Sequence, residues 1–425
     1  MEMKPRKIIN IMCHPPAYNL FWNDPKPEIN WDTPDGKWVG VWGKDWAELI
    51  GKEVLKLSDE FIYEVWQPDL RADKIYTHTF SDGLVRRLFP AVSVGRFYGL
   101  KKRKYVFSQS ICRSLAIENM KNEIVVHLNG VHSGISRSIL SLTLDCPVAA
   151  IFLGEVKPRL HSLITFKKNM LGKLNDIQEY FILKKMFDKI DFVGYCNEKS
   201  RDNLRAYFRG EGGMLHAGID CNIWKRRRDK SNTRRKLGLD GGALIVLSSA
   251  RFNSLKQIDR MISILEDLDR DGCHFQYVVT GHGDLNYEVY LTSVGKRLIA
   301  KNKLKFVGFL PEEKLVEYYN AADLFAITSL SEGAPVSAIK ALAMELPVFS
   351  TNTGLVAEHL LKYHAGVVVP LRDYKAWKLR LKDIFNGQKV RTIDRNIVKS
   401  LFHWPNVASR YVEMYSILYK NYYCG

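Results

Sequence analysis

Short apolar segments alternate along the chain with longer segments whose apolar residues recur at helical spacing. In the first half, the segments expected to be buried strands are residues 8–12, 124–128, 148–153 and 192–195. The helical patterns between them cover residues 45–57, 175–189 and 198–208. Strands that alternate with helices in this way are typical of a parallel sheet flanked by helices.

The same alternation begins again in the second half of the chain. Strands are expected at residues 244–248, 275–280, 305–307, 324–328 and 348–351, and helices at 257–269, 312–320 and 335–344. A chain of 425 residues is also longer than one hydrophobic core usually supports. The pattern therefore predicts an α/β protein made of two doubly wound, Rossmann-like domains.

The break between the two patterns falls in a strongly charged stretch, residues 224–236, which we interpret as a linker. The expected domains are residues 1–222 and residues 223–404. Two such domains that face each other leave a cleft where the carboxyl ends of both sheets meet, and ligands of open α/β sheets bind at those ends.

Composition and cysteine usage narrow the class of protein. The 46% apolar and 12% aromatic content is ample for packed cores, so wholesale disorder is excluded. No segment approaches the roughly 18 uncharged apolar residues that a membrane-spanning helix needs, and the start of the chain is too short for a secretory signal. Seven scattered cysteines without a CxxC pair favour reduced thiols and a cytoplasmic location.

The formal net charge of +17 points to an anionic partner. Basic residues gather at 101–104, 157–173 and 225–236, and no acidic residue lies between Val156 and Asn175. A basic, partly apolar segment of this kind can lie on an anionic membrane surface, although a solvated loop explains it equally well. Nucleic acid is the weaker alternative, because no zinc-finger spacing, RNP-like signature or basic-region heptad accompanies the charge.

The most informative chemistry lies in residues 328–358. Glu332 and Gly333 follow a predicted strand, and Pro335 stands where the first helical residue is expected. A carboxylate beside the start of a helix can hold a polyol, while the helix dipole and its N–H groups hold an anion. That combination suits a sugar linked to phosphate.

Two other strand ends in the second half carry compatible groups. Arg251 and Lys256 follow the strand at 244–248, and two such cations can neutralise a diphosphate leaving group. Gly281-His282-Gly283 follows the next strand, where glycine allows a backbone to approach a ligand closely.

With these motifs in order, the second half resembles the donor-binding domain of the retaining GT-B glycosyltransferases of glycosyltransferase family 4. The residues that carry the resemblance are 250–256, 279–283, 306–311, 319–323, 329–333 and 347–354. In the first half, residues 189–197 and 216–220 match less specifically. Residues 402–404 and the tyrosine-rich final helix are similar to the family's closing segment, which implies that residues 405–425 pack back on the N-terminal domain.

The resemblance implies roles for individual residues. Arg251 and Lys256 would hold the donor diphosphate, and Glu332, the first glutamate of the family's E-x7-E pattern, would bind hydroxyls of the transferred sugar. The residues implied to bind the donor are Gly40, Gly281, Gly283, Gly333, Ala334, Pro335, Val336, Lys340, Thr353, Gly354 and Glu358. The family is described as retaining, by front-face attack assisted by the leaving phosphate, so no cofactor and no essential metal are expected.

The sequence departs from the family pattern at two places. Position 340, where the second glutamate belongs, is a lysine, whose ammonium can only donate hydrogen bonds. Lys340 therefore contacts a phosphate or carboxylate, or the nucleotide is held differently, or the site is weakened. Glu345 stands where the family usually has a small residue.

The second departure concerns the first domain. The histidine that the family often places after the strand at 148–152 is missing, which leaves His127, Asn129, His132 and Glu155 as polar candidates for the acceptor side. Gly36, Gly40 and Gly43 resemble the family's N-terminal glycine loop, although an ordinary turn explains them almost as well.

These observations lead to the hypothesis of a hexosyltransferase. It would move a sugar from a UDP- or GDP-linked donor to a glycan or lipid-linked acceptor in cell-surface polysaccharide or glycoconjugate biosynthesis, in the cytoplasm or at the inner face of the membrane. Two alternatives stay open: a protein of this fold that binds sugar nucleotides without turnover, and an epimerase or phosphorylase on the same architecture.

Overall fold

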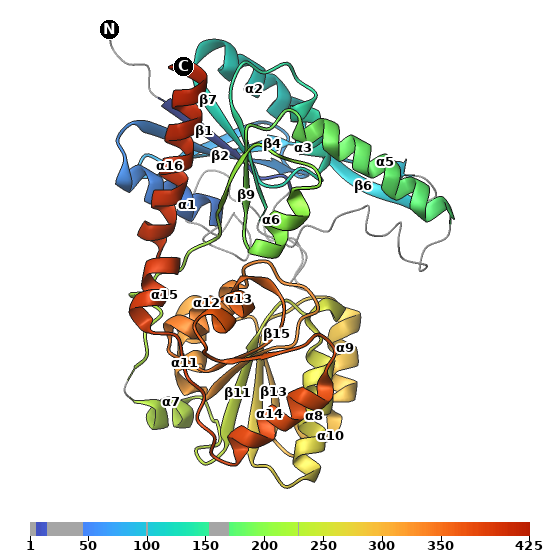
Figure 1. Ribbon diagram of the computed structural model, residues 1–425, viewed down its shortest axis with the longest axis vertical. Coiled ribbons are helices and arrows are strands. Elements are labelled where there is room, and N and C mark those ends of the chain that lie inside the picture. The colour runs from blue at the N-terminus through green and yellow to red at the C-terminus, as the bar shows by residue number, and fades with distance from the viewer. Residues whose placement is uncertain (1–5, 15–45, 99–100, 153–169, 228) are drawn as a thin grey trace. The chain divides into compact units, whose positions relative to one another are not determined.

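The computed structural model describes residues 6–14, 46–98, 101–152, 170–227 and 229–425 (Figure 1). The chain divides into two compact units, which cover Met1–Ala217 with Val407–Gly425 and Gly218–Asn406 and are called unit 1 and unit 2. The chain crosses between the units after Ala217 and after Asn406, a few residues from the predicted crossings after residues 222 and 404. Each unit contains one large sheet with helices on both faces (Figure 1), so the predicted α/β architecture with a sheet in each domain is confirmed.

Unit 1 is built on an eight-stranded sheet in which β1 (Arg6–Ile11) lies between β2 (Phe61–Asp69) and β7 (Ile124–Leu128). The remaining strands are β3 (Tyr76–Thr79), β4 (Val85–Pro90), β8 (Val148–Phe152), β9 (Phe192–Tyr195) and β10 (Glu211–Met214), in the sheet order β10-β9-β8-β7-β1-β2-β4-β3. All described pairs are parallel except β3 with β4, so an antiparallel strand closes one edge. Antiparallel edge strands are common on otherwise parallel sheets.

Helices cover both faces of this sheet and bury its apolar residues. The helices of one face are α2 (Gln109–Lys121), α3 (Gly134–Leu140), α5 (Met170–Phe187) and α6 (Glu198–Leu204), whose apolar residues share a core with Ile9, Val126 and Trp66. On the other face lie α1 (Trp46–Leu57) and the last helix, α16 (Trp404–Tyr423). Helix α5 corresponds to the helix expected at 175–189, and it begins five residues earlier than predicted.

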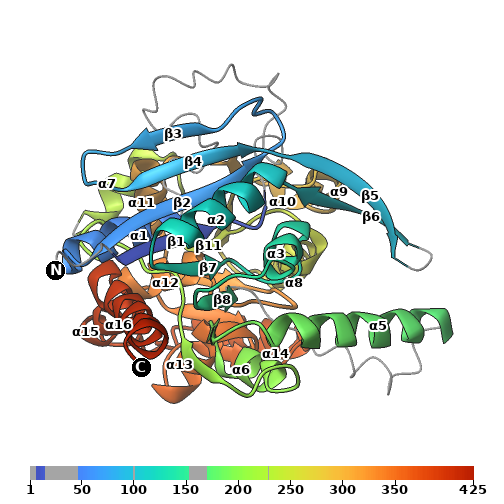
Figure 2. The same ribbon diagram turned by 90° about the horizontal axis from the view of Figure 1, so that it is seen from above.

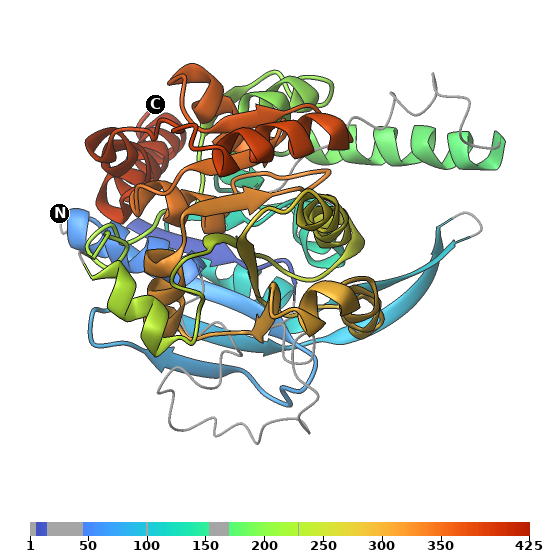
Figure 3. The ribbon, with the colours of Figure 1, turned by 90° about the horizontal axis from the view of Figure 1, so that it is seen from below.

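The region from β2 to β6 is where the sequence prediction of strands was incomplete. Strand β4 was not predicted, because its two arginines interrupt the apolar pattern. Arg86 is nevertheless fully buried and donates to Glu48 and Gln67. Strands β5 (Val92–Tyr98) and β6 (Lys101–Phe107) pair as a separate antiparallel hairpin. This hairpin and α5 extend from unit 1 in the same direction (Figures 2 and 3).

Helix α16 is held on unit 1 by tyrosines that recur every four residues. The Tyr415 hydroxyl lies 2.7 Å from Nδ1 of His127 and 3.1 Å from the Tyr63 hydroxyl. The Tyr423 hydroxyl donates to the backbone oxygen of Ile124 and accepts from its N–H. Residues at this spacing share one face of a helix, and the predicted packing of the final helix on the first domain is confirmed.

Unit 2 contains a six-stranded sheet in which all described neighbours pair in parallel. Its strands are β11 (Leu244–Ser249), β12 (Phe275–Thr280), β13 (Leu304–Gly308), β14 (Leu324–Ile327), β15 (Val348–Thr351) and β16 (Val367–Val369), in the order β13-β12-β11-β14-β15-β16. The predicted strands of the second half are confirmed within one residue at each end.

The order of the strands places the helices on two faces (Figure 1). Helices α8 (Ile258–Arg270), α9 (Leu285–Val294), α10 (Lys296–Ala300) and α14 (Tyr374–Phe385) share one core with the sheet. The other face carries α11 (Glu312–Ala321), α12 (Val336–Ala343) and α13 (Gly354–Lys362), and α15 (Arg395–Phe402) packs against α12.

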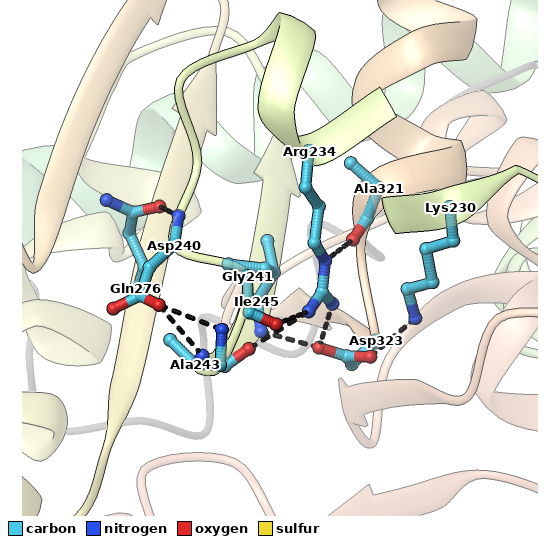
Figure 4. A network of polar contacts seen from close by, with 10 residues as sticks. Lys230, Arg234, Asp240, Gly241, Ala243, Ile245, Gln276, Ala321 and Asp323 are labelled. Carbon is cyan, nitrogen blue, oxygen red and sulfur yellow. Dashed lines mark hydrogen bonds and ion pairs between the residues drawn. The ribbon is translucent and has the colours of Figure 1, made fainter. Parts of the chain in front are cut away.

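Residues 224–236 do not form the linker that we expected. Trp224 is fully buried in unit 2, and residues Lys230–Lys236 form helix α7. Arg234 of α7 donates to the backbone oxygens of Ala321 and Ala243, and pairs with Asp323 at the start of β14 (Figure 4). The Asp323 carboxylate also accepts the N–H of Ile245 at 2.7 Å. The basic run is therefore part of the second domain.

Replacement of Asp323 by alanine tests this assignment. The change leaves the Arg234 guanidinium, whose side chain is 10% exposed, without its carboxylate. Because it also removes an acceptor from a partly buried N–H, we expect a loss of about 2–4 kcal/mol in the free energy of unfolding. Urea titration is the measurement.

Asp267→Ala is the matched control, since it removes a carboxylate from an exposed pair with Arg270 and should cost less than about 1 kcal/mol. Equal losses in the two variants would contradict a structural role for the Arg234–Asp323 pair.

Candidate functional site

The loops after β11, β14 and β15 in unit 2 gather the residues that sequence reasoning selected. Strand β14 lies between β11 and β15, and all three run in the same direction. Their carboxyl ends therefore share one edge of the sheet. Arg251 and Lys256 follow β11, Glu332 follows β14, and Thr353 follows β15.

Lys256 and Glu332 are paired directly. The Lys256 ammonium lies 2.7 Å from Oε1 of Glu332, and their side chains are 23% and 10% exposed. The Ser329 hydroxyl donates to the same carboxylate oxygen at 2.6 Å. The two charges neutralise each other in a partly desolvated position, while Arg251 is exposed on the same loop as Lys256.

The backbone of Lys256 is fixed against the loop that follows β14. The Thr328 hydroxyl lies 2.9 Å from the Lys256 carbonyl oxygen and 3.0 Å from that of Gln257. The Leu330 N–H donates to the Leu255 oxygen at 2.8 Å. Lys256 ends a 3₁₀ turn, and Gln257 has a positive φ of 50° before α8 begins. The position of the lysine is therefore set by contacts with the loop of Glu332.

A glycine permits the third loop to pack against Glu332. The Glu332 N–H donates to the Thr353 hydroxyl at 3.2 Å, and the Leu355 N–H donates to the Gly333 oxygen. Gly354 has a φ of 77°, and a Cβ there would lie 2.8 Å from Cβ of Glu332. Only glycine fits both the conformation and the space, so the turn at Thr353–Gly354 packs against the backbone and Cβ of Glu332.

Gly281 and Gly283 follow β12, on the same edge of the sheet. Glycine is needed at these positions for a different reason from the expected approach of a ligand. A Cβ at Gly281 would lie 2.0 Å from the Ala250 oxygen, and one at Gly283 would lie 2.0 Å from the Phe252 oxygen. The close approach that these glycines permit is to the neighbouring loop. The Phe252 N–H donates to the His282 oxygen at 2.9 Å, which locks the Arg251 loop to the loop after β12.

The loop before α12 presents the start of a helix. Pro335 is the residue before the first helical position rather than the first residue itself, and α12 has no side-chain hydrogen bond at its cap. Gly333 is buried, and Ala334 and Val336 are half-buried. The N–H groups of a helix start favour an anion. Glu358 is half-buried on α13.

Lys340, the departure from the E-x7-E pattern, is held by two residues outside that pattern. Its ammonium lies 4.3 Å from the centre of the Trp224 ring and 4.0 Å from Oε1 of Glu312. The Trp224 indole N–H donates to the same oxygen at 3.0 Å. Burial lowers the pKa of the Lys340 ammonium, and Glu312 acts in the opposite direction. Of the alternatives that the sequence left open, contact with a carboxylate is the one that the structure shows.

The polar candidates of unit 1 have different surroundings. His127 is fully buried, and burial lowers its pKa to about 3. Its Nδ1 contacts Tyr415 of α16, and its Nε2 has no hydrogen-bond partner among the described residues. The Asn129 amide donates to Asn10 at 2.6 Å and to the Ile11 oxygen at 3.0 Å. His127 is therefore closed to solvent, and the half-buried Asn129 is bound to residues of β1.

His132 is exposed, and its ring centre lies 6.2 Å from that of Phe152. Glu155, the glycines at 36, 40 and 43, and most of the basic segment 157–173 lie outside the described residues. Among the described residues, no group of three or more His, Cys, Asp or Glu side chains is arranged to hold a metal ion. No described helix is long and apolar enough to cross a membrane.

Sequence reasoning missed several residues of this edge. Ser329, Thr328 and Thr351 link the loops, and the Thr351 hydroxyl donates to the Ser329 oxygen at 2.6 Å. A run of hydroxyl residues at strand ends was the available signal. Trp224 and Glu312 had no such signal, because their contact with Lys340 depends on tertiary structure.

Part of the second unit is similar to a known protein family. Residues 229–397 match the family model described as glycosyl transferases group 1. One curated relative, the amylovoran biosynthesis glycosyltransferase AmsK of Erwinia amylovora, is 31% identical over 155 residues, which is 34% of this chain and 37% of the relative. The matched stretches of the curated relatives cover 37–57% of their lengths.

Solved structures resemble the whole chain. Sucrose-phosphate synthase from Thermosynechococcus elongatus has a TM-score of 0.70 at 15% identity, over 99% of this chain and all of that one. Anabaena HepE in complex with UDP has a TM-score of 0.66 at 15% identity, over 98% of this chain and all of that one. At these identities the likeness shows the fold, and that fold is GT-B.

Replacement of Lys340 by glutamate, the residue of the family pattern, should be harmful. It would place a second carboxylate beside Glu312 and against the negative face of the Trp224 ring. We expect a loss of about 1–3 kcal/mol in the free energy of unfolding, measured by urea titration.

The double variant Glu312→Gln/Lys340→Glu removes the like-charge contact and should recover part of that loss. If Lys340→Glu is as stable as the unmodified protein, the ammonium is not held by Trp224 and Glu312 as described.

Proposed function

We propose that the protein is a retaining hexosyltransferase, which its GT-B fold and the match of residues 229–397 to the glycosyl transferases group 1 family model support. It transfers a sugar from a nucleotide diphosphate donor to a glycan or lipid-linked acceptor. The observation that carries the proposal is the direct pairing of Lys256 with Glu332 at the carboxyl edge of the unit 2 sheet. This pair puts a cation for a diphosphate beside a carboxylate for a polyol.

Each residue has a chemical task in the proposed reaction. Arg251 and Lys256 stabilise the negative charge that develops on the leaving diphosphate, and Glu332 accepts hydrogen bonds from sugar hydroxyls. The start of α12 adds N–H groups for the phosphate. The acceptor oxygen forms its bond to the anomeric carbon on the face from which the diphosphate departs, and its proton passes to the departing phosphate oxygen.

The donor and acceptor classes are part of the proposal. UDP is the first nucleotide to test, because a solved structure of the same fold holds UDP, and GDP is the second. A glycan acceptor in cell-surface polysaccharide synthesis is supported by the relative named for amylovoran biosynthesis. We propose that no divalent cation is required, since two side-chain cations lie at the strand ends where the diphosphate binds.

Two variants test the site assignment. Glu332→Gln and Lys256→Met should each lower sugar transfer from the UDP- or GDP-linked donor by at least roughly 100-fold, because each removes an interaction with the reacting donor. Product formation and nucleotide release are measured together, and activity in EDTA should equal activity without it.

Glu317→Gln and Lys378→Met are the controls, since these side chains form exposed or peripheral pairs with Lys314 and Asp271. Unmodified rates in Glu332→Gln or Lys256→Met would remove the assignment. Nucleotide binding without release or transfer would favour the non-catalytic alternative. Dependence on inorganic phosphate would identify a phosphorylase, and donor conversion without an acceptor an epimerase.

We further propose that the basic segment 157–173 brings the protein to an anionic membrane surface. Co-sedimentation with vesicles that contain anionic phospholipid should be strong at low salt, weak at high salt, and absent with neutral vesicles. Lys167→Ser/Lys168→Ser should weaken it by roughly tenfold.

Lys378→Ser/Lys382→Ser changes the net charge equally, but these two ammoniums are already paired with Asp271. Equal weakening in the two double variants would show that only the total charge matters, and no binding at low salt would refute the membrane proposal.

A further inference from the structure

The ion pair between Lys256 and Glu332 is also a contact that a donor must open. We propose that the pair is the resting state of the site, that the donor diphosphate draws Lys256 away from Glu332, and that Ser329 is a positioning residue that then keeps the carboxylate in place. This inference rests on the proposed function. It adds a basis for distinguishing a complete sugar donor from the bare nucleotide.

Two side chains share one oxygen atom of the Glu332 carboxylate. Oε1 of Glu332 accepts from the Lys256 ammonium at 2.7 Å and from the Ser329 hydroxyl at 2.6 Å. Lys256 cannot bind a diphosphate with its full charge while it neutralises Glu332. If the ammonium moves to a phosphate, the Ser329 hydroxyl remains as a donor to the carboxylate.

The contacts around Ser329 and Lys256 determine which of these two side chains can move away from Glu332. Ser329 is 2% exposed, and its carbonyl oxygen accepts from the Thr351 hydroxyl. Its hydroxyl is one carbon from this fixed backbone. Thr328 fixes the backbone of Lys256 as well. The Lys256 side chain, however, is 23% exposed, and its ammonium lies at the end of a flexible four-carbon stem. The lysine can therefore exchange partners, whereas the serine stays.

The exchange has different consequences for a sugar donor and for a free nucleoside diphosphate. Both ligands take Lys256 from Glu332. The sugar donor brings hydroxyls that donate to the released carboxylate, but the free nucleotide leaves that carboxylate half-buried beside a new anion. Like charges at short distance repel strongly where water is excluded. Glu332 should therefore oppose binding of the bare nucleotide and favour the complete donor.

Calorimetric titration of the full chain with UDP, GDP and their sugar-linked forms tests this inference. In Glu332→Gln, the nucleoside diphosphate should bind roughly tenfold more tightly than in the unmodified protein, because the competing carboxylate is gone. The sugar-linked donor should lose its advantage over the bare nucleotide. Glu317→Gln makes the same change of charge on α11, where the Glu317 side chain is 31% exposed and pairs with Lys314, and should shift neither affinity by more than about twofold.

Ser329 is tested by the split between kcat and KM. Ser329→Ala should lower kcat by roughly tenfold with little change in KM, because the hydroxyl matters after Lys256 has left. Ser329→Thr, which keeps a hydroxyl, should restore part of the rate. An unchanged kcat in Ser329→Ala would overturn the positioning role, and so would a lower kcat without rescue by threonine.

The outcomes separate this inference from the proposed function. If Glu332→Gln abolishes transfer but binds the nucleoside diphosphate no more tightly, the resting-state contact is refuted and the enzyme assignment stands. If the unmodified protein binds no nucleoside diphosphate or sugar-linked form, the proposed function fails and this inference fails with it.

Discussion

Lys256 and Glu332 are 76 positions apart in the sequence, and their ion pair depends on two strands that lie side by side. β11 and β14 are neighbours only because the chain reverses its direction across the sheet after β13. That reversal brings two loops to the same carboxyl edge, where a doubly wound sheet binds its ligands. The ion pair, the serine beside it and the helix start after it all follow from this one feature of topology.

The loops are held to one another by backbone contacts that leave little freedom. Gly354 accommodates Glu332, and Gly281 and Gly283 accommodate the Arg251 loop. The Thr328 hydroxyl links the carbonyl groups of Lys256 and Gln257 to the strand that leads to Glu332. A site built in this way is ordered before a ligand arrives, which is what electrostatic stabilisation of a leaving group requires. The Lys256 ammonium is the group that can change partners when a ligand binds.

The sequence predicted the second unit well because its strands are continuous apolar segments and its site residues follow those strands directly. It predicted unit 1 less completely, since the buried Arg86 disguises β4 and the hairpin β5–β6 has no strong alternation. The basic run at 224–236 was misinterpreted as a linker because its charges give no indication of the partly buried Arg234–Asp323 pair. Position 345 illustrates a similar limit, since Glu345 adopts a φ of 54° at the end of α12, where glycine is the usual residue.

Lys340 shows why local chemistry alone was insufficient. Its residue type suggested a weakened site, but its contacts with Trp224 and Glu312 come from segments 116 and 28 positions earlier in the chain. Those contacts give the lysine a structural reason to be there, independent of any nucleotide. Nothing in the spacing of residues 332–340 could have indicated them.

A crystal structure of the protein with a bound UDP- or GDP-linked sugar would show directly whether Lys256 exchanges Glu332 for the donor. We expect the diphosphate to lie against Arg251 and Lys256, with the Lys256 ammonium withdrawn from Glu332 and the sugar hydroxyls on that carboxylate. A nucleotide bound away from the carboxyl edge of the unit 2 sheet, or one bound there with the Lys256–Glu332 pair still closed, would contradict it.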